Sequence, residues 1–249
     1  MKRLIPVFIF LGFLLPLVSR AAILLDATST DGHDTQRNAG TYSWSQTVNG
    51  SNDLLLVQVS NHLPTSDQVT GVTYNGAAMT RLAALQDAAS DNYAYLYGLV
   101  GPSTGTHSVA VTVGTTAYYD FSAVAYSGVD QTNGAGTFAT GTATISGTTV
   151  AATVTSVPAN AWLIGYFRSD GGTPITAGTS TTARVNTFGL ALGSAVSWTF
   201  DSGGPLTAGS HYLAANAGGS AALGIIAVAV PTASSAAAKP ARRKAELIN

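Results

Sequence analysis

The chain has 249 residues, of which 46% are hydrophobic and 9% charged, with 27 glycines, no cysteine and a formal net charge of −1. This composition excludes a disordered chain and is typical of short strands joined by many turns. Residues 22–230 hold eleven aspartates, four arginines and no lysine, a net charge of −7. We expect no nucleic-acid partner, because an acidic body without a basic stripe cannot neutralise phosphates.

The first 21 residues are predicted to be a secretory signal peptide. Lys2 and Arg3 precede an apolar run over residues 4–18, and the small residues Ser19 and Ala21 suit a signal peptidase that leaves Ala22 as the first residue of the mature chain. The run is shorter than the roughly 20 residues that span a bilayer. We therefore expect a secreted, extracellular or cell-surface protein with no membrane span after cleavage.

Residues 22–230 are predicted to form one all-β domain. Their apolar residues recur with period two or in short runs, punctuated by Gly, Asn, Asp, Pro and Ser. Asn75-Gly76 predicts a tight hairpin turn, and residues 128–147 are expected to be a long loop within the domain. The expected strands cover residues 23–27, 42–48, 53–60, 69–74, 79–86, 93–100, 107–113, 119–127, 149–155, 162–168, 182–188, 195–200 and 223–230.

The strands are expected to pack as a two-sheet antiparallel β-sandwich. Residues 54–57 and 223–230 are continuous apolar runs, as in strands covered on both faces, whereas residues 108–113 alternate. The segments 52–60, 69–76, 105–109 and 125–132 resemble a jelly-roll domain of the kind found in secreted and cell-surface bacterial proteins and in phage particles. The resemblance implies a jelly-roll-like sandwich with a surface, adhesive or ligand-binding role, and it carries over no catalytic residues.

One segment resembles the nucleophile region of chymotrypsin-like serine proteases. It runs from Asp201 through Ser202 to Leu206, and His62 and Asp120 precede it in the chain order of that family. However, Phe200 stands where the family has a glycine whose backbone N–H is one of the donors of the oxyanion hole. We interpret Ser202 as a turn residue, so a secreted hydrolase is the third-ranked function and the chain is not expected to be an enzyme.

Two further groups of residues are candidate binding sites. Asp26, Asp31 and Asp34 lie close in sequence and predict a Ca²⁺ site, with ordinary turn formation as the alternative. Tyr93, Tyr95 and Tyr97 alternate along one strand and so share one face, where they would stack on sugar rings or else fill the sandwich core.

Residues 231–249 are predicted to be a low-complexity linker and basic tail. The predicted function is therefore a secreted, non-catalytic surface or matrix module that acts in adhesion or assembly, with other copies of itself or glycans as partners. The alternative is a carbohydrate-binding module with structural calcium.

Overall fold

The computed structural model describes residues 22–62, 66–89, 92–170, 175–188 and 195–234, and within them the side chains of all residues except 32–34, 185–188 and 195. These residues form strands and a single 3₁₀ turn, η1 (Ala135–Thr137). The strands are β1 (Leu24–Arg37), β2 (Gly40–Val48), β3 (Leu54–His62), β4 (Val69–Tyr74), β5 (Ala77–Ala78), β6 (Thr80–Gln86), β7 (Asn92–Val100), β8 (Gly105–Val113), β9 (Ala117–Ser127), β10 (Thr140–Val157), β11 (Trp162–Asp170), β12 (Ile175–Ala177), β13 (Thr182–Phe188), β14 (Ala195–Asp201) and β15 (Gly209–Val230).

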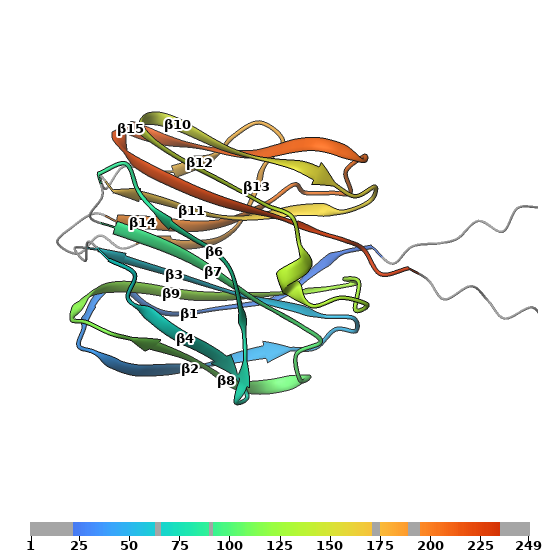
Figure 1. The fold of residues 1–249 in the computed structure, drawn as a ribbon, viewed down its shortest axis with the longest axis horizontal. Helices are drawn as coiled ribbons and strands as arrows, with labels where there is room; N and C mark the ends of the chain where they lie inside the picture. The colour runs from blue at the N-terminus through green and yellow to red at the C-terminus, as the bar shows by residue number, and fades with distance from the viewer. Residues whose placement is uncertain (1–21, 63–65, 90–91, 171–174, 189–194, 235–249) are drawn as a thin grey trace, which may run out of the picture.

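The strands form three antiparallel sheets that stack in layers (Figure 1). The outer sheet has the order β2-β8-β4-β5, the central sheet β1-β9-β3-β7-β6, and the third sheet β10-β15-β11-β14-β13, with β12 pairing with β15. The expected all-β sandwich is confirmed. β1–β9 form two of the sheets and β10–β15 form the third, so residues 22–230 contain three sheets where two were expected.

The first nine strands divide between two sheets. β1, β3, β6, β7 and β9 lie in the central sheet, while β2, β4, β5 and β8 lie in the outer sheet. The hairpin between β4 and β5 turns at Asn75 and Gly76, whose φ angles are 48° and 78°. Positive φ at both positions is what a two-residue primed turn requires, so the predicted hairpin is confirmed.

The central sheet is buried on both faces, which explains the continuous apolar run in β3. Leu55, Val57 and Val59 point into the core shared with the outer sheet. Leu54 and Leu56 point the other way, into the core shared with the third sheet. Since neighbouring residues of a strand face opposite sides, a strand without a solvent face needs apolar residues at every position.

The third sheet folds back on itself through the long strands β10 and β15. Residues 140–147 of β10 pair with residues 221–228 of β15, and residues 149–157 pair with residues 209–216. The two halves of β10 touch, because a Cβ on Gly141 would lie 2.1 Å from the carbonyl oxygen of Thr153. A third core fills the fold between the two halves of the sheet; its members include Val150, Leu213, Phe167 and Ile225.

The expected long loop over residues 128–147 is wrong in its second part. Residues 140–147 are the first half of β10, and only the crossover before them is irregular. This half contains Thr, Ala, Gly and Ser with Ile145 as its single large apolar residue, so the hydrophobic pattern of a strand is missing. Pairing with β15 nevertheless makes it a strand. Within the described ranges, the chain contains no helix that is long and apolar enough to cross a bilayer.

Candidate functional surfaces

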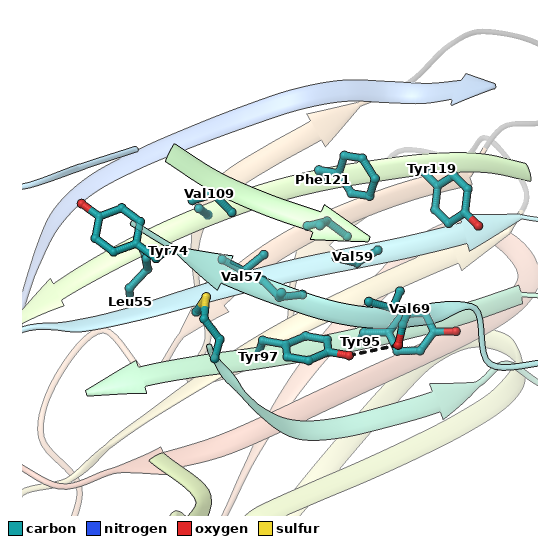
Figure 2. Close-up of a cluster of buried hydrophobic side chains, with 14 of the residues drawn as sticks. Leu55, Val57, Val59, Val69, Tyr74, Tyr95, Tyr97, Val109, Tyr119 and Phe121 are labelled. Carbon is teal, nitrogen blue, oxygen red and sulfur yellow. Dashed lines mark hydrogen bonds between the residues drawn. The ribbon is translucent and has the colours of Figure 1, made fainter. Parts of the chain in front are cut away.

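The tyrosine row of β7 faces the core. Tyr95 is 0% and Tyr97 4% exposed, and Tyr93 packs partly buried against the same cluster (Figure 2). The Tyr95 hydroxyl accepts a hydrogen bond from the backbone N–H of Gln68 at 3.0 Å, and that of Tyr97 accepts one from Nε of Arg81 at 2.9 Å. Burial raises the pKa of both hydroxyls. The rings of Tyr95 and Tyr97 therefore cannot stack on a sugar unless the sandwich opens, whereas Tyr93 keeps part of its surface exposed.

The aspartates of the candidate calcium site are not brought together. Asp26 and Asp31 are five residues apart on β1, about 16 Å for an extended strand. Asp26 accepts a hydrogen bond from the backbone N–H of Asn49 at 2.7 Å, while Asp31 pairs with Arg37 at 3.1 Å. The side chain of Asp34 lies outside the described residues. Among the side chains that are described, no three His, Asp or Glu residues are placed to share a metal ion.

Ser202 lies in a turn after β14. Its hydroxyl donates to the carbonyl oxygen of Gly204 at 2.7 Å, and the Asp201 carboxylate accepts from the backbone N–H of Gly203 at 2.8 Å. Gly203 has a φ of 68°, which a glycine adopts without strain. The turn uses Ser and Gly for the conformational reasons expected from the sequence.

His62 and Asp120 lie far from that turn. The Tyr126 hydroxyl contacts Asp201 at 2.9 Å, which places the turn beside residue 126 of β9. Asp120 is six residues away on the same strand, about 20 Å. It accepts a hydrogen bond from Ser60 at 2.9 Å, and Nε2 of His62 lies 3.9 Å from Asp170. The three side chains of the protease-like reading therefore do not form a triad.

Polar residues are concentrated at one end of the interface between the central and third sheets. Along three strands, the side chains that point into this interface change from largely apolar to polar in the same direction. On β3, Leu54 and Leu56 are followed by Gln58 and Ser60, and on β9, Tyr126 and Val124 lie opposite the apolar end while Ser122 and Asp120 lie opposite the polar end. On β11, Trp162 and Ile164 are followed by Tyr166 and Arg168. Ser122 donates to Gln58 across 2.9 Å. Burial, with the charge of Asp120 added, raises the pKa of Tyr166. This buried polar zone orients the two layers and is closed to solvent.

The longest uncharged edge of the molecule is β10. It contains 18 residues, none of them charged, and β15 is its only strand partner in the described part of the chain. In the arm over residues 149–157, Val150, Ala152 and Val154 are buried, whereas Ala151, Thr153 and Thr155 are exposed. This arm therefore presents edge backbone flanked by small side chains, except at Thr153, whose carbonyl oxygen faces Gly141 of the other arm.

The outward face of the outer sheet is also uncharged. Its positions on β2 and β8 are Thr41, Ser43, Ser45 and Thr47, and Thr106, Ser108, Ala110 and Thr112. Hydroxyls meet across the strands, with Oγ1 atoms 2.9 Å apart between Thr41 and Thr112 and 2.8 Å apart between Thr47 and Thr106. Because no like charges oppose each other there, this face presents no electrostatic barrier to association.

A polar groove of about 540 Å³ lies beside the last described residues, with Ser234 in its lining. The described chain begins and ends at the same end of the molecule (Figure 1). Its lining comes from the crossover between the sheets, the end of β10 and the segment after β15, and includes Asp130, Asn133, Thr137, Phe138, Ser156 and Thr232. Sequence reasoning did not find it, since it joins three segments far apart in the chain. The only local signal was the cluster of turn-forming residues after Gly128.

Comparison of the chain with protein-family models, with curated proteins and with solved structures found no match.

Proposed function

We propose that this protein is a secreted, non-catalytic surface or matrix module that acts in adhesion or assembly, and that copies join through the edge of β10. The observation that carries the proposal is the uncharged edge strand itself. An open edge is a template for pairing with another chain, and natural sheets usually block it with lysine, proline or bulges. β10 contains neither lysine nor proline within residues 140–157, and its register along β15 shifts between Gly147 and Thr149 and between Val154 and Val157.

Three of the other edge strands carry charges. β1 carries Asp26, Asp31 and Arg37, β6 carries Arg81 and packs beside η1, and β13 carries Arg184. Charges oppose the addition of a strand. The edges of the outer sheet, β2 and β5, are uncharged but have nine and two residues against the 18 of β10, so length favours β10.

Of the two arms of β10, residues 149–157 are the better contact. The arm over residues 140–147 pairs with residues 221–228 of β15, and in that region Leu85 of β6 lies against Gly224. The arm over residues 149–157 lies in the half of the third sheet that folds away from the central sheet. Two such arms, one from each of two copies, can pair antiparallel about a two-fold axis and form a continuous sheet. Because each copy uses the same surface, the assembly is complete as a dimer.

The test is a pair of lysines on the exposed side of this arm, Thr153→Lys with Thr155→Lys. A matched control places the same charges on the interior strands of the outer sheet, Thr70→Lys with Thr106→Lys. Light scattering over a concentration series is expected to show dimers for the wild type and the control, and monomers for the β10 variant. A wild type that stays monomeric at the highest concentration, or a β10 variant that dimerises like the wild type, contradicts the proposal.

A further inference from the structure

The groove beside the C-terminal segment is built from backbone that is held in place. The backbone N–H of Asp130 donates to the carbonyl oxygen of Pro231 at 2.9 Å, and that of Ala233 donates to the carbonyl oxygen of Gly128 at 2.8 Å. Val129 and Thr232 form a β-bridge between these two segments. The segment after β15 is therefore fixed against the crossover that links the central and third sheets.

The polar side chains on the groove are oriented as well. Asp130 accepts hydrogen bonds at Oδ1 from both the backbone N–H and the hydroxyl of Thr132, at 2.9 and 2.6 Å. Thr137 donates from its backbone N–H and its hydroxyl to the carbonyl oxygen of Gly134, at 3.0 and 2.9 Å. A groove whose walls are ordered before binding loses little conformational entropy when a ligand enters.

One buried hydroxyl on the groove has no hydrogen-bond partner among the described residues. Thr232 is 6% exposed, and its Oγ1 makes no hydrogen bond with any described residue. A buried hydroxyl left unpaired costs free energy, which a hydrogen bond from a ligand would recover. Thr232 lines the groove, so a ligand seated there lies within its reach.

The chemistry of the lining selects the class of ligand. Asn133 and Ser156 offer donors and acceptors on short exposed side chains, Asp130 offers acceptors, and Pro158 offers exposed apolar surface. Among the described residues, no Lys, Arg or His lines the groove. A volume of about 540 Å³ falls within the range of small-molecule sites. Sugars combine hydroxyl edges with apolar ring faces and carry no charge.

We propose that this groove binds an uncharged oligosaccharide, with Thr232, Asp130 and Asn133 as hydrogen-bonding residues and the exposed Pro158 as the apolar contact. The site is distinct from the tyrosine row of β7. It borders the β10 arm over residues 149–157 through Ser156, so light scattering of Ser156→Trp shows whether this substitution also changes self-assembly. The proposal does not depend on self-assembly, which light scattering measures separately.

The experiment uses the full chain and an array of neutral oligosaccharides, followed by titration calorimetry with each glycan retained. Ser156→Trp fills the groove, and Ser146→Trp makes the same substitution at an exposed position of the same strand, away from the groove. Ser156→Trp is expected to weaken binding by about tenfold or more, a loss of one or two contacts, and Ser146→Trp to leave it unchanged. Thr232→Val is expected to weaken binding while the unfolding midpoint stays equal or rises.

Three outcomes overturn the proposal. The first is that no neutral glycan is retained on the array or titrates in the calorimeter. The second is that Ser156→Trp binds as tightly as the wild type or that Ser146→Trp loses binding equally. The third is that Thr232→Val lowers the unfolding midpoint without changing affinity, which would make the hydroxyl a purely structural group.

Discussion

Arg168 of β11 donates a hydrogen bond from Nη1 to Oδ2 of Asp87, which follows β6, over 2.8 Å. The two side chains are 1% and 2% exposed, so the pair joins the third sheet to the central sheet inside the protein. Asp87 also accepts from Asn92 at 2.6 Å and from the backbone N–H of Ala89 at 3.1 Å. The guanidinium is less well satisfied, because its Nε and Nη2 atoms have no partner among the described residues.

Removing the charge of Asp87 is expected to destabilise the protein strongly. Asp87→Asn leaves the Arg168 cation buried without a counter-ion, and losses of this kind amount to about 3–5 kcal/mol. Adding Arg168→Met removes the stranded charge and is expected to recover part of that stability. The measurement is urea denaturation followed by tryptophan fluorescence, since Trp162 and Trp198 lie in the third sheet.

The exposed pair between Arg81 and Asp67 serves as the control for this experiment. Its side chains are 36% and 44% exposed, so Asp67→Asn is expected to cost less than about 1 kcal/mol. Equal losses for Asp67→Asn and Asp87→Asn, or a double variant no more stable than Asp87→Asn alone, would show that burial does not govern the strength of the pair.

Asp53 gives the protein a pH dependence that runs opposite to that of most carboxylates. Burial, with the charge of Asp26 added, raises the pKa of Asp53 above its ordinary 3.8. The folded state then binds the proton more tightly than the unfolded state, so stability falls as pH rises from 3.8 through the folded pKa. The Asp53→Asn variant has no carboxyl group at this position and so does not lose stability in this way as pH rises. Its stability relative to the wild type is expected to increase between pH 3 and pH 7 in denaturation curves, and parallel curves would refute this assignment.

Alanine substitutions at Gly128 and Gly76 separate the effect of backbone conformation on stability from the effect of a steric contact. The two glycines have φ angles of 77° and 78°. A Cβ on Gly128 would lie 2.1 Å from the carbonyl oxygen of Ala22, whereas a Cβ on Gly76 would meet nothing within 4 Å. Gly76→Ala is expected to cost about 1–2 kcal/mol for the left-handed conformation alone. Gly128→Ala is expected to cost more, because the first segment of the chain must move. Equal unfolding midpoints for Gly128→Ala and Gly76→Ala would mean that the contact with Ala22 does not affect stability.

Export is expected to leave Ala22, or a residue next to it, at the N-terminus. The basic residues, apolar run and small residues of the first 21 positions form the pattern that a signal peptidase recognises. Mass spectrometry of the protein recovered outside an expressing bacterium checks this prediction. An intact Met1 on a membrane-associated form, with no shorter exported species, would contradict it.

The sequence predicted strands well wherever large apolar residues alternate or run together. β3, β4 and β13 lie within two residues of their expected bounds, because Leu, Val and Tyr or a β-branched pattern mark them. It failed for the first halves of β10 and β15, where Thr, Ala and Gly dominate. Small side chains carry little burial signal. These segments are strands because residues 140–147 pair with residues 221–228 and residues 209–216 pair with residues 149–157, which satisfies their backbone.

The sites were harder to predict than the strands. The alternation of Tyr93, Tyr95 and Tyr97 places them on one face of β7, but only the stacking of the sheets decides whether that face meets solvent or the core. Similarly, the run over residues 223–230 indicates a strand covered on both sides without naming what covers it. The groove depends on the meeting of Asp130, Ser156 and Thr232, which no local pattern encodes.

The position of β15 has a consequence for biosynthesis. It is the last strand among the described residues, yet it lies between β10 and β11 in the third sheet. A nascent chain that has not reached residue 209 leaves β10 without its partner strand and leaves Leu54 and Leu56 without part of their cover. The protein therefore cannot finish folding from its N-terminus as it emerges. A truncated product would expose both a bare strand and an apolar sheet face, which makes incomplete chains prone to aggregation and easy for proteases to remove.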